Sequence, residues 1–183
     1  MKQLFVKKGQ VIIEDVPPPL VDDGSVLVEV KYSLISAGTE TAGITASGES
    51  LLRKVLKQPE KVKKVLNMAK GQGLSQTAAQ VKDKLESAAT PIGYSCSGVV
   101  IDVGENIRDI KIADRVACAG AGYANHAEIV CVPRNLVVKV PENLDLKEAA
   151  SVTLGSIAMQ GVRQANPTFG ELMTCFKMSV DQN

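Results

Sequence analysis

The stretch Val26-Leu27-Val28-Glu29-Val30-Lys31-Tyr32 alternates along the chain and opens after the turn Asp22-Asp23-Gly24. Because side chains two residues apart share one face of a strand, this pattern predicts a β-strand with one buried face. Short strand patterns lie on both sides of it, at 4–6, 11–13, 98–104, 114–118, 126–133 and 136–140. Several short strands at close spacing favour a barrel or a sandwich.

Residues 49–88 separate the two strand-rich regions and have helical periodicity. Val62, Val65, Leu66 and Ala69 recur at the spacing of one helix face, which predicts amphipathic helices. A last helix is expected over 146–164. The expected fold class is therefore mainly β with helices (α+β), with a helical segment inserted between the strands.

The helical segment is also basic, because residues 49–86 hold nine Lys and Arg against four Asp and Glu. It contains no aromatic residue to stack on bases, and its charges fall on the solvent side of the apolar stripes. A solvated face or a lid over the cleft is favoured over a nucleic-acid site. The whole chain is nearly balanced, with 21 Lys and Arg against 20 Asp and Glu. Neither nucleic acid nor a membrane is expected as a partner.

The lack of a targeting signal in the sequence and the pattern of its cysteines predict a cytoplasmic location. No apolar run approaches the roughly 18 residues of a membrane-spanning helix, and the N-terminus lacks a signal-peptide pattern. The four cysteines, Cys96, Cys118, Cys131 and Cys175, form no C-x-x-C pair. We expect them to be buried or half-buried free thiols rather than metal ligands or disulfides.

Five short motifs occur in a characteristic order. They are Ile35-Ser36-Ala37-Gly38-Thr39-Glu40, Gly93-Tyr94-Ser95-Cys96-Ser97-Gly98-Val99-Val100, Asp114-Arg115-Val116, Ala127-Glu128 with Val132-Pro133, and Ala149-Ala150-Ser151-Val152-Thr153-Leu154-Gly155. This order resembles the GroES-like catalytic domain of the medium-chain dehydrogenase/reductase (alcohol-dehydrogenase-like) superfamily. The resemblance is closest to zinc-free members, such as bidomain oxidoreductases and bacteriochlorophyllide-type dehydrogenases. It implies a GroES-like, partly open β-barrel.

The resemblance also implies where a catalytic zinc would be bound in zinc-dependent members. Those places hold Ser36 or Ala37, Tyr94 and Leu154 in this chain. Catalytic zinc needs about three nitrogen, sulfur or oxygen ligands from the protein, so no zinc is expected. The four-cysteine structural zinc lobe is missing as well. Ala113 stands where the family usually has glycine, which predicts an unusual turn before Asp114.

Without zinc, hydrogen-bond donors must polarise the substrate oxygen. The resemblance brings the hydroxyls of Ser36, Thr39 and Tyr94 to one cleft, which makes them candidate catalytic groups. In the alternative, Ser36 and Thr39 only bond a turn and Tyr94 fills space.

Two titratable side chains complete the candidate set. His126, the only histidine, is a candidate acid/base at the start of a strand. A role in capping that strand or bonding a backbone carbonyl is favoured over the catalytic one. Glu40 either orients Thr39 or is a solvated turn carboxylate, and the second interpretation is favoured.

Family members follow this domain with a nucleotide-binding Rossmann domain that carries G-x-G-x-x-G. After Gly170 this sequence has no glycine. We therefore expect a GroES-like catalytic domain over 1–170 with the helical insertion at 41–90, an aberrant tail at 171–183 and no Rossmann domain. NAD or NADP is implied for the full-length family, and neither cofactor is expected for this chain.

The predicted function is the truncated catalytic domain of a zinc-independent NAD(P)-dependent oxidoreductase that is inactive alone. The alternative is a non-enzymatic GroES-like binding or assembly module. The face of the last helix that carries Ile157 and Met159 is expected to be uncovered, and covering it with the tail or a second copy would give a homodimer. The substrate is not identified.

Overall fold

The computed structural model describes residues 1–48, 89–168 and 170. The helices predicted over 49–88 and the tail at 171–183 lie outside these residues. The elements follow the order β1 (Lys2–Lys7), β2 (Gln10–Asp15), β3 (Ser25–Ser33), α1 (Ala37–Gly48), β4 (Thr90–Pro91), β5 (Ser95–Val103), β6 (Arg115–Ala119), β7 (Ile129–Pro133), a 3-10 turn (Arg134–Leu136), β8 (Val137–Lys139), α5 (Leu146–Ala149) and α6 (Val152–Ala165). The predicted strands are confirmed, and β4 is added to them.

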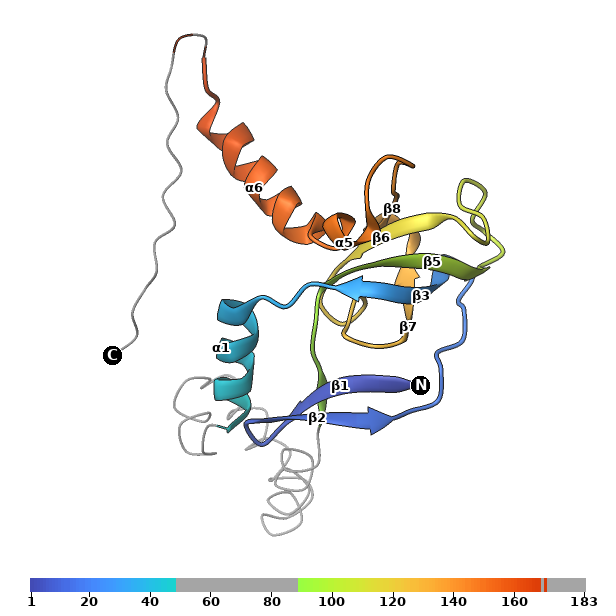
Figure 1. Ribbon diagram of the computed structural model, residues 1–183, viewed down its shortest axis with the longest axis vertical. Helices are drawn as coiled ribbons and strands as arrows, with labels where there is room; N and C mark the ends of the chain where they lie inside the picture. Colours follow the sequence, from blue (N-terminus) through green and yellow to red (C-terminus); the bar gives the residue numbers. More distant parts are fainter. Residues whose placement is uncertain (49–88, 169, 171–183) are drawn as a thin grey trace, which may run out of the picture.

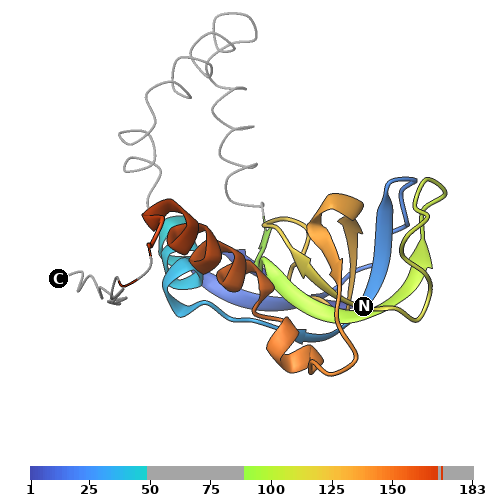
Figure 2. The ribbon, with the colours of Figure 1, turned by 90° about the horizontal axis from the view of Figure 1, so that it is seen from above.

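The strands form two antiparallel sheets. Five strands are arranged in the order β7-β3-β5-β6-β8, and three in the order β2-β1-β4. Figures 1 and 2 show the larger sheet curled into a half-barrel, with β1 and β2 beside it. Backbone hydrogen bonds from Leu4 N–H to the His126 carbonyl and from Glu128 N–H to the Lys2 carbonyl join the two sheets. This arrangement confirms the α+β fold class and the partly open barrel.

The core lies inside the curl of the larger sheet. It is made of small branched side chains and two thiols that water does not reach: Val26, Val28, Val100, Val116, Val132, Cys96 and Cys118. The alternation of Val26–Tyr32 explains this core, since Val26 and Val28 are buried while Glu29 and Lys31 are not. Complete burial of a valine stabilises a fold by about 1.5–3 kcal/mol.

The helix predicted over 146–164 is broken into two pieces. The buried Ser95 hydroxyl donates to the Ala150 carbonyl at 2.6 Å and accepts from the Thr153 N–H at 3.2 Å. These two backbone groups lie at the break between α5 and α6. The Ser95 hydroxyl, which comes from β5, takes the place of the backbone hydrogen bonds that a continuous helix would make there. The neighbouring Ser97 hydroxyl donates to the Leu146 carbonyl at the start of α5. Both serines thereby fix the helices to the sheet.

From this anchor α6 projects away from the sheet (Figure 1). None of its residues is buried, and Ile157 and Met159 are 63% and 55% exposed. The prediction that this face is uncovered holds for the described residues. No helix within these residues is long and apolar enough to cross a membrane.

The turn before Asp114 is unusual, as the sequence predicts. Ala113 has a φ of 71°, in the left-handed region, where a side chain costs roughly 1–2 kcal/mol and glycine costs little. The Ala113 N–H nevertheless donates to the Val100 carbonyl at 2.9 Å. That bond holds the turn against β5.

Gly98 marks the closest approach of β3 and β5. A Cβ atom at this position would lie 2.0 Å from the Glu29 carbonyl oxygen. We expect Gly98→Ala to lower the free energy of unfolding by at least about 2–3 kcal/mol, because two paired backbones must separate. Urea unfolding measures the change. Gly24→Ala is the matched control, since a Cβ there meets nothing within 4 Å. Equal unfolding midpoints for the two variants would contradict the prediction.

Candidate functional site

The site begins where β3 passes into α1. Ser36 directly precedes the helix, and its backbone N–H donates to Glu40 Oε1 at 3.0 Å. The Ser36 hydroxyl donates to Thr39 Oγ1 at 3.3 Å. A side-chain carboxylate that reaches back to the residue before its helix satisfies one of the free amides of the first turn. Ser36, Thr39 and Glu40 are thereby held in one hydrogen-bonded cluster.

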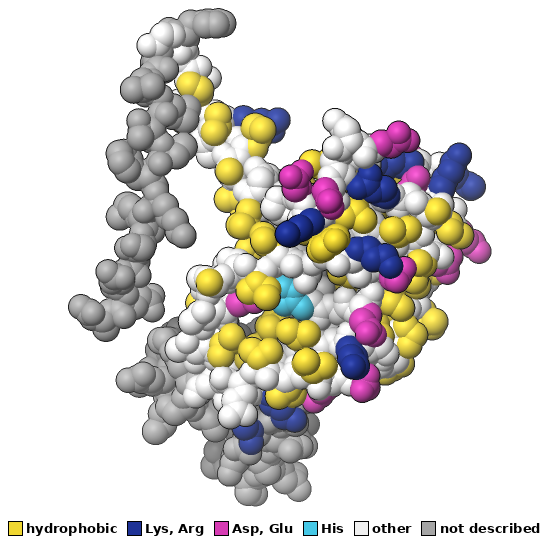
Figure 3. All heavy atoms as spheres, in the orientation of Figure 1, with side chains coloured by type: hydrophobic (Ala, Val, Ile, Leu, Met, Phe, Trp, Pro, Cys, Tyr) yellow, Lys and Arg dark blue, Asp and Glu magenta, His cyan; other side chains and the backbone are white. Residues whose placement is uncertain are grey.

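His126 joins this cluster from the loop before β7. Its Nε2 lies 3.0 Å from Glu40 Oε1, and its Nδ1 lies 2.9 Å from the Ser33 hydroxyl at the end of β3. The imidazole is 5% exposed and the Glu40 side chain 11%. Figure 3 shows the only histidine, in cyan, between hydrophobic side chains on the face that carries β1, β2 and α1. The site thus lies between α1 and the two sheets.

The hydrogen-bond partners decide where the imidazole carries its proton. An ionised carboxylate can only accept hydrogen bonds, so the nitrogen facing Glu40, Nε2, is the one that is protonated. In neutral imidazole Nδ1 then has a free lone pair and accepts from the Ser33 hydroxyl. Both ring nitrogens are occupied by protein groups.

The backbone at His126 lies so close to position 93 that only glycine fits there. Gly93 has a φ of +103°, and a Cβ there would lie 2.5 Å from the His126 backbone nitrogen. The His126 N–H donates to the Ile92 carbonyl at 2.8 Å. The segment before β5 therefore packs directly on the loop that carries the histidine.

Tyr94 is half-buried and is not part of the cluster. Within residues 1–48, 89–168 and 170 its hydroxyl makes no hydrogen bond, whereas its carbonyl accepts from the Thr153 hydroxyl at 3.0 Å and from Gly120 N–H at 2.9 Å. Of the four predicted catalytic residues, three (Ser36, Thr39 and His126) are thus brought together by side-chain and backbone hydrogen bonds. Tyr94 directly follows Gly93, whose backbone packs against the backbone of Asn125 and His126.

Two interpretations from the sequence are wrong. Glu40 is not a solvated turn carboxylate, because its side chain is buried against His126. His126 neither caps a strand nor bonds a carbonyl with its ring, and β7 begins only at Ile129. Ser33 was missed altogether. The role of this strand-end serine depends on its hydrogen bond to His126, which lies 93 positions away in the sequence.

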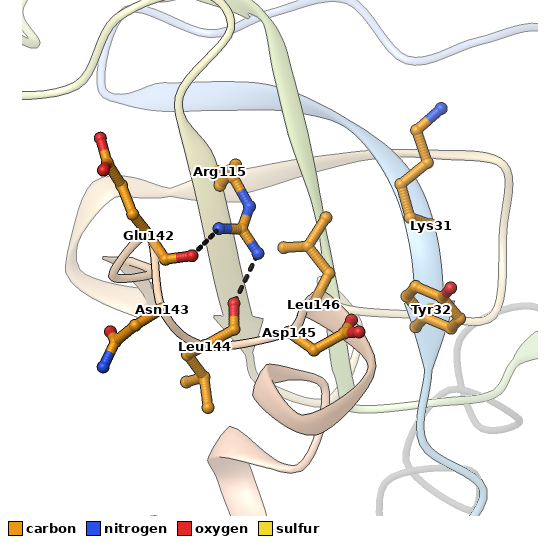
Figure 4. Close-up of a pocket in the computed structure, with 8 residues that line it drawn as sticks. All are labelled: Lys31, Tyr32, Arg115, Glu142, Asn143, Leu144, Asp145 and Leu146. Carbon is orange, nitrogen blue, oxygen red and sulfur yellow. Dashed lines mark hydrogen bonds between the residues drawn. The ribbon is translucent and has the colours of Figure 1, made fainter.

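A separate hollow lies beside β3 and the loop before α5. A space of about 670 Å³ is bordered by Lys31 and Tyr32 of β3 and by residues 142–146. Figure 4 shows Arg115 reaching across to the backbone carbonyls of Glu142 and Leu144. These bonds hold the loop before α5. None of the predicted site residues lines this hollow, so we do not assign the site to it.

The buried cysteines are unreactive thiols. Cys96 and Cys118 are paired across β5 and β6 and are both free and buried, while Cys131 is half-buried and free. A hydrogen bond with Cys96 and burial both raise the pKa of the Cys118 thiol far above its usual range. Because the thiolate is the metal ligand and nucleophile, neither role suits Cys118. The expectation of free thiols is confirmed for these three, and Cys175 lies outside the described residues.

Comparisons with known proteins agree with the fold. No family model matches the chain. The synaptic vesicle membrane protein VAT-1 homolog-like of Mus musculus is 36% identical over 70 residues, which cover 37% of this chain and 16% of that protein. The quinone oxidoreductase of Coxiella burnetii superposes with a TM-score of 0.64 at 20% identity, over 93% of this chain and 46% of that one.

The quinone oxidoreductase of Escherichia coli, solved in complex with NADPH, gives a TM-score of 0.61 at 13% identity, over 91% of this chain and 41% of that one. The chain therefore spans less than half the length of these proteins. Both quinone oxidoreductases share the half-barrel fold with this chain, and the E. coli protein is the one solved with NADPH. The chain thus shares the fold of the quinone oxidoreductases over most of its length, and the relatives support the resemblance of the five motifs to the GroES-like domain of the medium-chain dehydrogenase/reductase superfamily.

Proposed function

We propose that this chain forms the substrate side of the catalytic cleft of a zinc-independent, NAD(P)-dependent oxidoreductase acting on a carbonyl or alcohol group. The observation that carries this proposal is the hydrogen-bonded cluster between the start of α1 and the buried His126. Hydroxyl, imidazole and carboxylate groups are what a metal-free site needs to polarise and protonate a substrate oxygen.

The identity and contacts of the residues support zinc independence. Ser36 or Ala37, Tyr94 and Leu154 occupy the places of the zinc ligands, and none of them is a good donor for zinc. His126 is the natural substitute ligand, yet both of its nitrogens are hydrogen-bonded to protein groups. A zinc ion would have to displace Glu40 or Ser33 to reach it.

These 183 residues contain no G-x-G-x-x-G, the glycine-rich turn that binds a nicotinamide dinucleotide. That turn binds the cofactor pyrophosphate at a helix N-terminus. The E. coli relative binds NADPH. We propose that NAD or NADP reaches this site on another domain or polypeptide, and that the chain does not turn over substrate without it.

A binding experiment tests the proposed function. We expect a fully substituted quinone or a simple aryl ketone to shift the NMR signals of Thr39, Tyr94 and His126 in a saturable way, while NADPH leaves the spectrum unchanged. Removing a hydroxyl that bonds the carbonyl, with Thr39→Val or Tyr94→Phe, should weaken binding about three- to tenfold, equivalent to about 1 kcal/mol.

Ser156→Ala is the control for that experiment, since it removes a hydroxyl that only bonds the Val152 carbonyl within α6. Unaltered affinity in Thr39→Val and Tyr94→Phe would remove these residues from the site. If no carbonyl compound bound at all, the non-enzymatic binding module would be the better account of the chain.

Elemental analysis tests the metal-free site. Protein produced in zinc-supplemented medium and then dialysed should contain far less zinc than one ion per chain, because no ligand set of adequate donors is present. Glu40→Ala, which frees His126 Nε2, serves as a comparison in which weak zinc retention is expected. Tightly held, stoichiometric zinc in the unaltered chain would refute zinc independence.

The exposed face of α6 gives a prediction about self-association. Leu154 and Ile157, one turn apart on α6, together expose an apolar surface that a second copy can cover. We expect sedimentation velocity to show a concentration-dependent dimer, and Ile157→Glu to shift it toward monomer. Gln160→Glu, which adds the same charge without removing an apolar side chain, should leave the dimer intact. A monomer at all concentrations would contradict this role of α6.

A further inference from the structure

Ser33 is the exposed end of a three-residue chain of hydrogen bonds. It is the last residue of β3 and is open to solvent. Behind it, His126 Nδ1 lies 2.9 Å from its hydroxyl oxygen, and His126 Nε2 lies 3.0 Å from Glu40 Oε1. The two inner members are buried. The chain of bonds therefore opens to the outside at the serine hydroxyl.

The inner end of this chain is fixed by Glu40. Its Oε1 accepts from the Ser36 N–H as well as from His126 Nε2, so the carboxylate is held by the start of α1. A carboxylate in this position accepts a hydrogen bond from Nε2 and so keeps a proton on that nitrogen; a second proton makes the ring a cation. That second proton can bind only at Nδ1, which faces Ser33.

The other hydroxyls of the cluster have no such connection. Within the described residues, Thr39 Oγ1 contacts the Ser36 hydroxyl, and Ser36 contacts Glu40 through its backbone N–H. Neither hydroxyl is hydrogen-bonded to an imidazole nitrogen. Ser33 is thus the one hydroxyl in this part of the chain that can exchange a proton with His126 directly.

We propose that Ser33 is the proton-transfer residue of this site, with His126 as its proton reservoir and Glu40 as the group that positions the imidazole. This inference rests on the proposed function for its substrate, a carbonyl compound, and for its hydride donor, a reduced nicotinamide. The hydride goes to the carbonyl carbon. The carbonyl oxygen takes the Ser33 hydroxyl proton, and Ser33 takes the Nδ1 proton of the imidazolium.

After this step His126 is neutral, with its remaining proton on Nε2 facing Glu40. A solvent proton then returns through the Ser33 hydroxyl to Nδ1. In alcohol oxidation the same protons move in the opposite direction. General acid–base catalysis of this kind typically contributes about 10²–10⁴-fold to a rate.

The single histidine allows a test that needs no turnover. In protein labelled with ¹⁵N-histidine, every imidazole signal comes from His126. Nitrogen-15 relaxation dispersion of these signals measures how fast the ring takes up and loses its Nδ1 proton in exchange with water, because Nδ1 is the nitrogen that faces Ser33. If Ser33 delivers that proton, Ser33→Val should slow the exchange on the order of tenfold or more. Ser33→Thr, which has the same shape and keeps the hydroxyl, should exchange at the wild-type rate.

Amide spectra verify that both variants are folded, and Ser33→Ala provides a second variant without a hydroxyl that should also exchange slowly. Exchange at the wild-type rate in Ser33→Val and Ser33→Ala would overturn the relay, as would slow exchange in Ser33→Thr. The outcome is independent of the oxidoreductase proposal. Carbonyl binding without the Ser33 effect refutes only the relay, and the Ser33 effect without carbonyl binding refutes only the proposed function.

Discussion

The antiparallel pairing of β3 with β5 determines where everything else in this chain lies. It is so close at Gly98 that a single added carbon would collide with the Glu29 carbonyl. Because the strands run in opposite directions, the end of β3 and the start of β5 meet at one end of the sheet, with Ser33 opposite Cys96. Ser33 and the start of α1 leave from that end. The Gly93 segment that packs on His126 enters there, so the site is a consequence of the register.

Glu40 connects this end of the sheet to α1. Burying a carboxylate is costly unless its oxygens are hydrogen-bonded, and here one oxygen accepts from both Ser36 N–H and His126 Nε2. The same two bonds fix the first turn of α1 and the orientation of the imidazole. A structural role and a chemical role therefore coincide in Glu40. Removing it would disturb both, whereas replacing Ser33 at its exposed strand end removes the hydrogen bond to His126 Nδ1 and leaves the contacts of Glu40 in place.

The strands could be predicted from the sequence because their signals are local, and the structure brings three of the four candidate residues into one hydrogen-bonded cluster. Alternation located β3, and the motifs around Ser36, Thr39 and His126 are short. The break between α5 and α6 could not be predicted, since it depends on Ser95, 55 positions before Ala150. The pairing of Glu40 with His126 spans 86 positions, and without it a glutamate after a turn looks solvated. Tyr94 is a candidate for its place in a motif, yet within the described residues its hydroxyl has no hydrogen-bond partner.

Replacing a metal by hydrogen bonds changes what the protein must supply. A zinc ion polarises an oxygen through its charge and needs no proton to do so. A hydroxyl stabilises the developing oxyanion only while it donates, and complete reduction of a carbonyl also requires a proton. A metal-free site therefore needs a proton store close to its donors. In the proposed site, His126 is that store, because it lies between Ser33 and Glu40 and is hydrogen-bonded to both. Under this proposal, the two hydrogen bonds that occupy its nitrogens would both exclude a metal and connect the imidazole to the proton path.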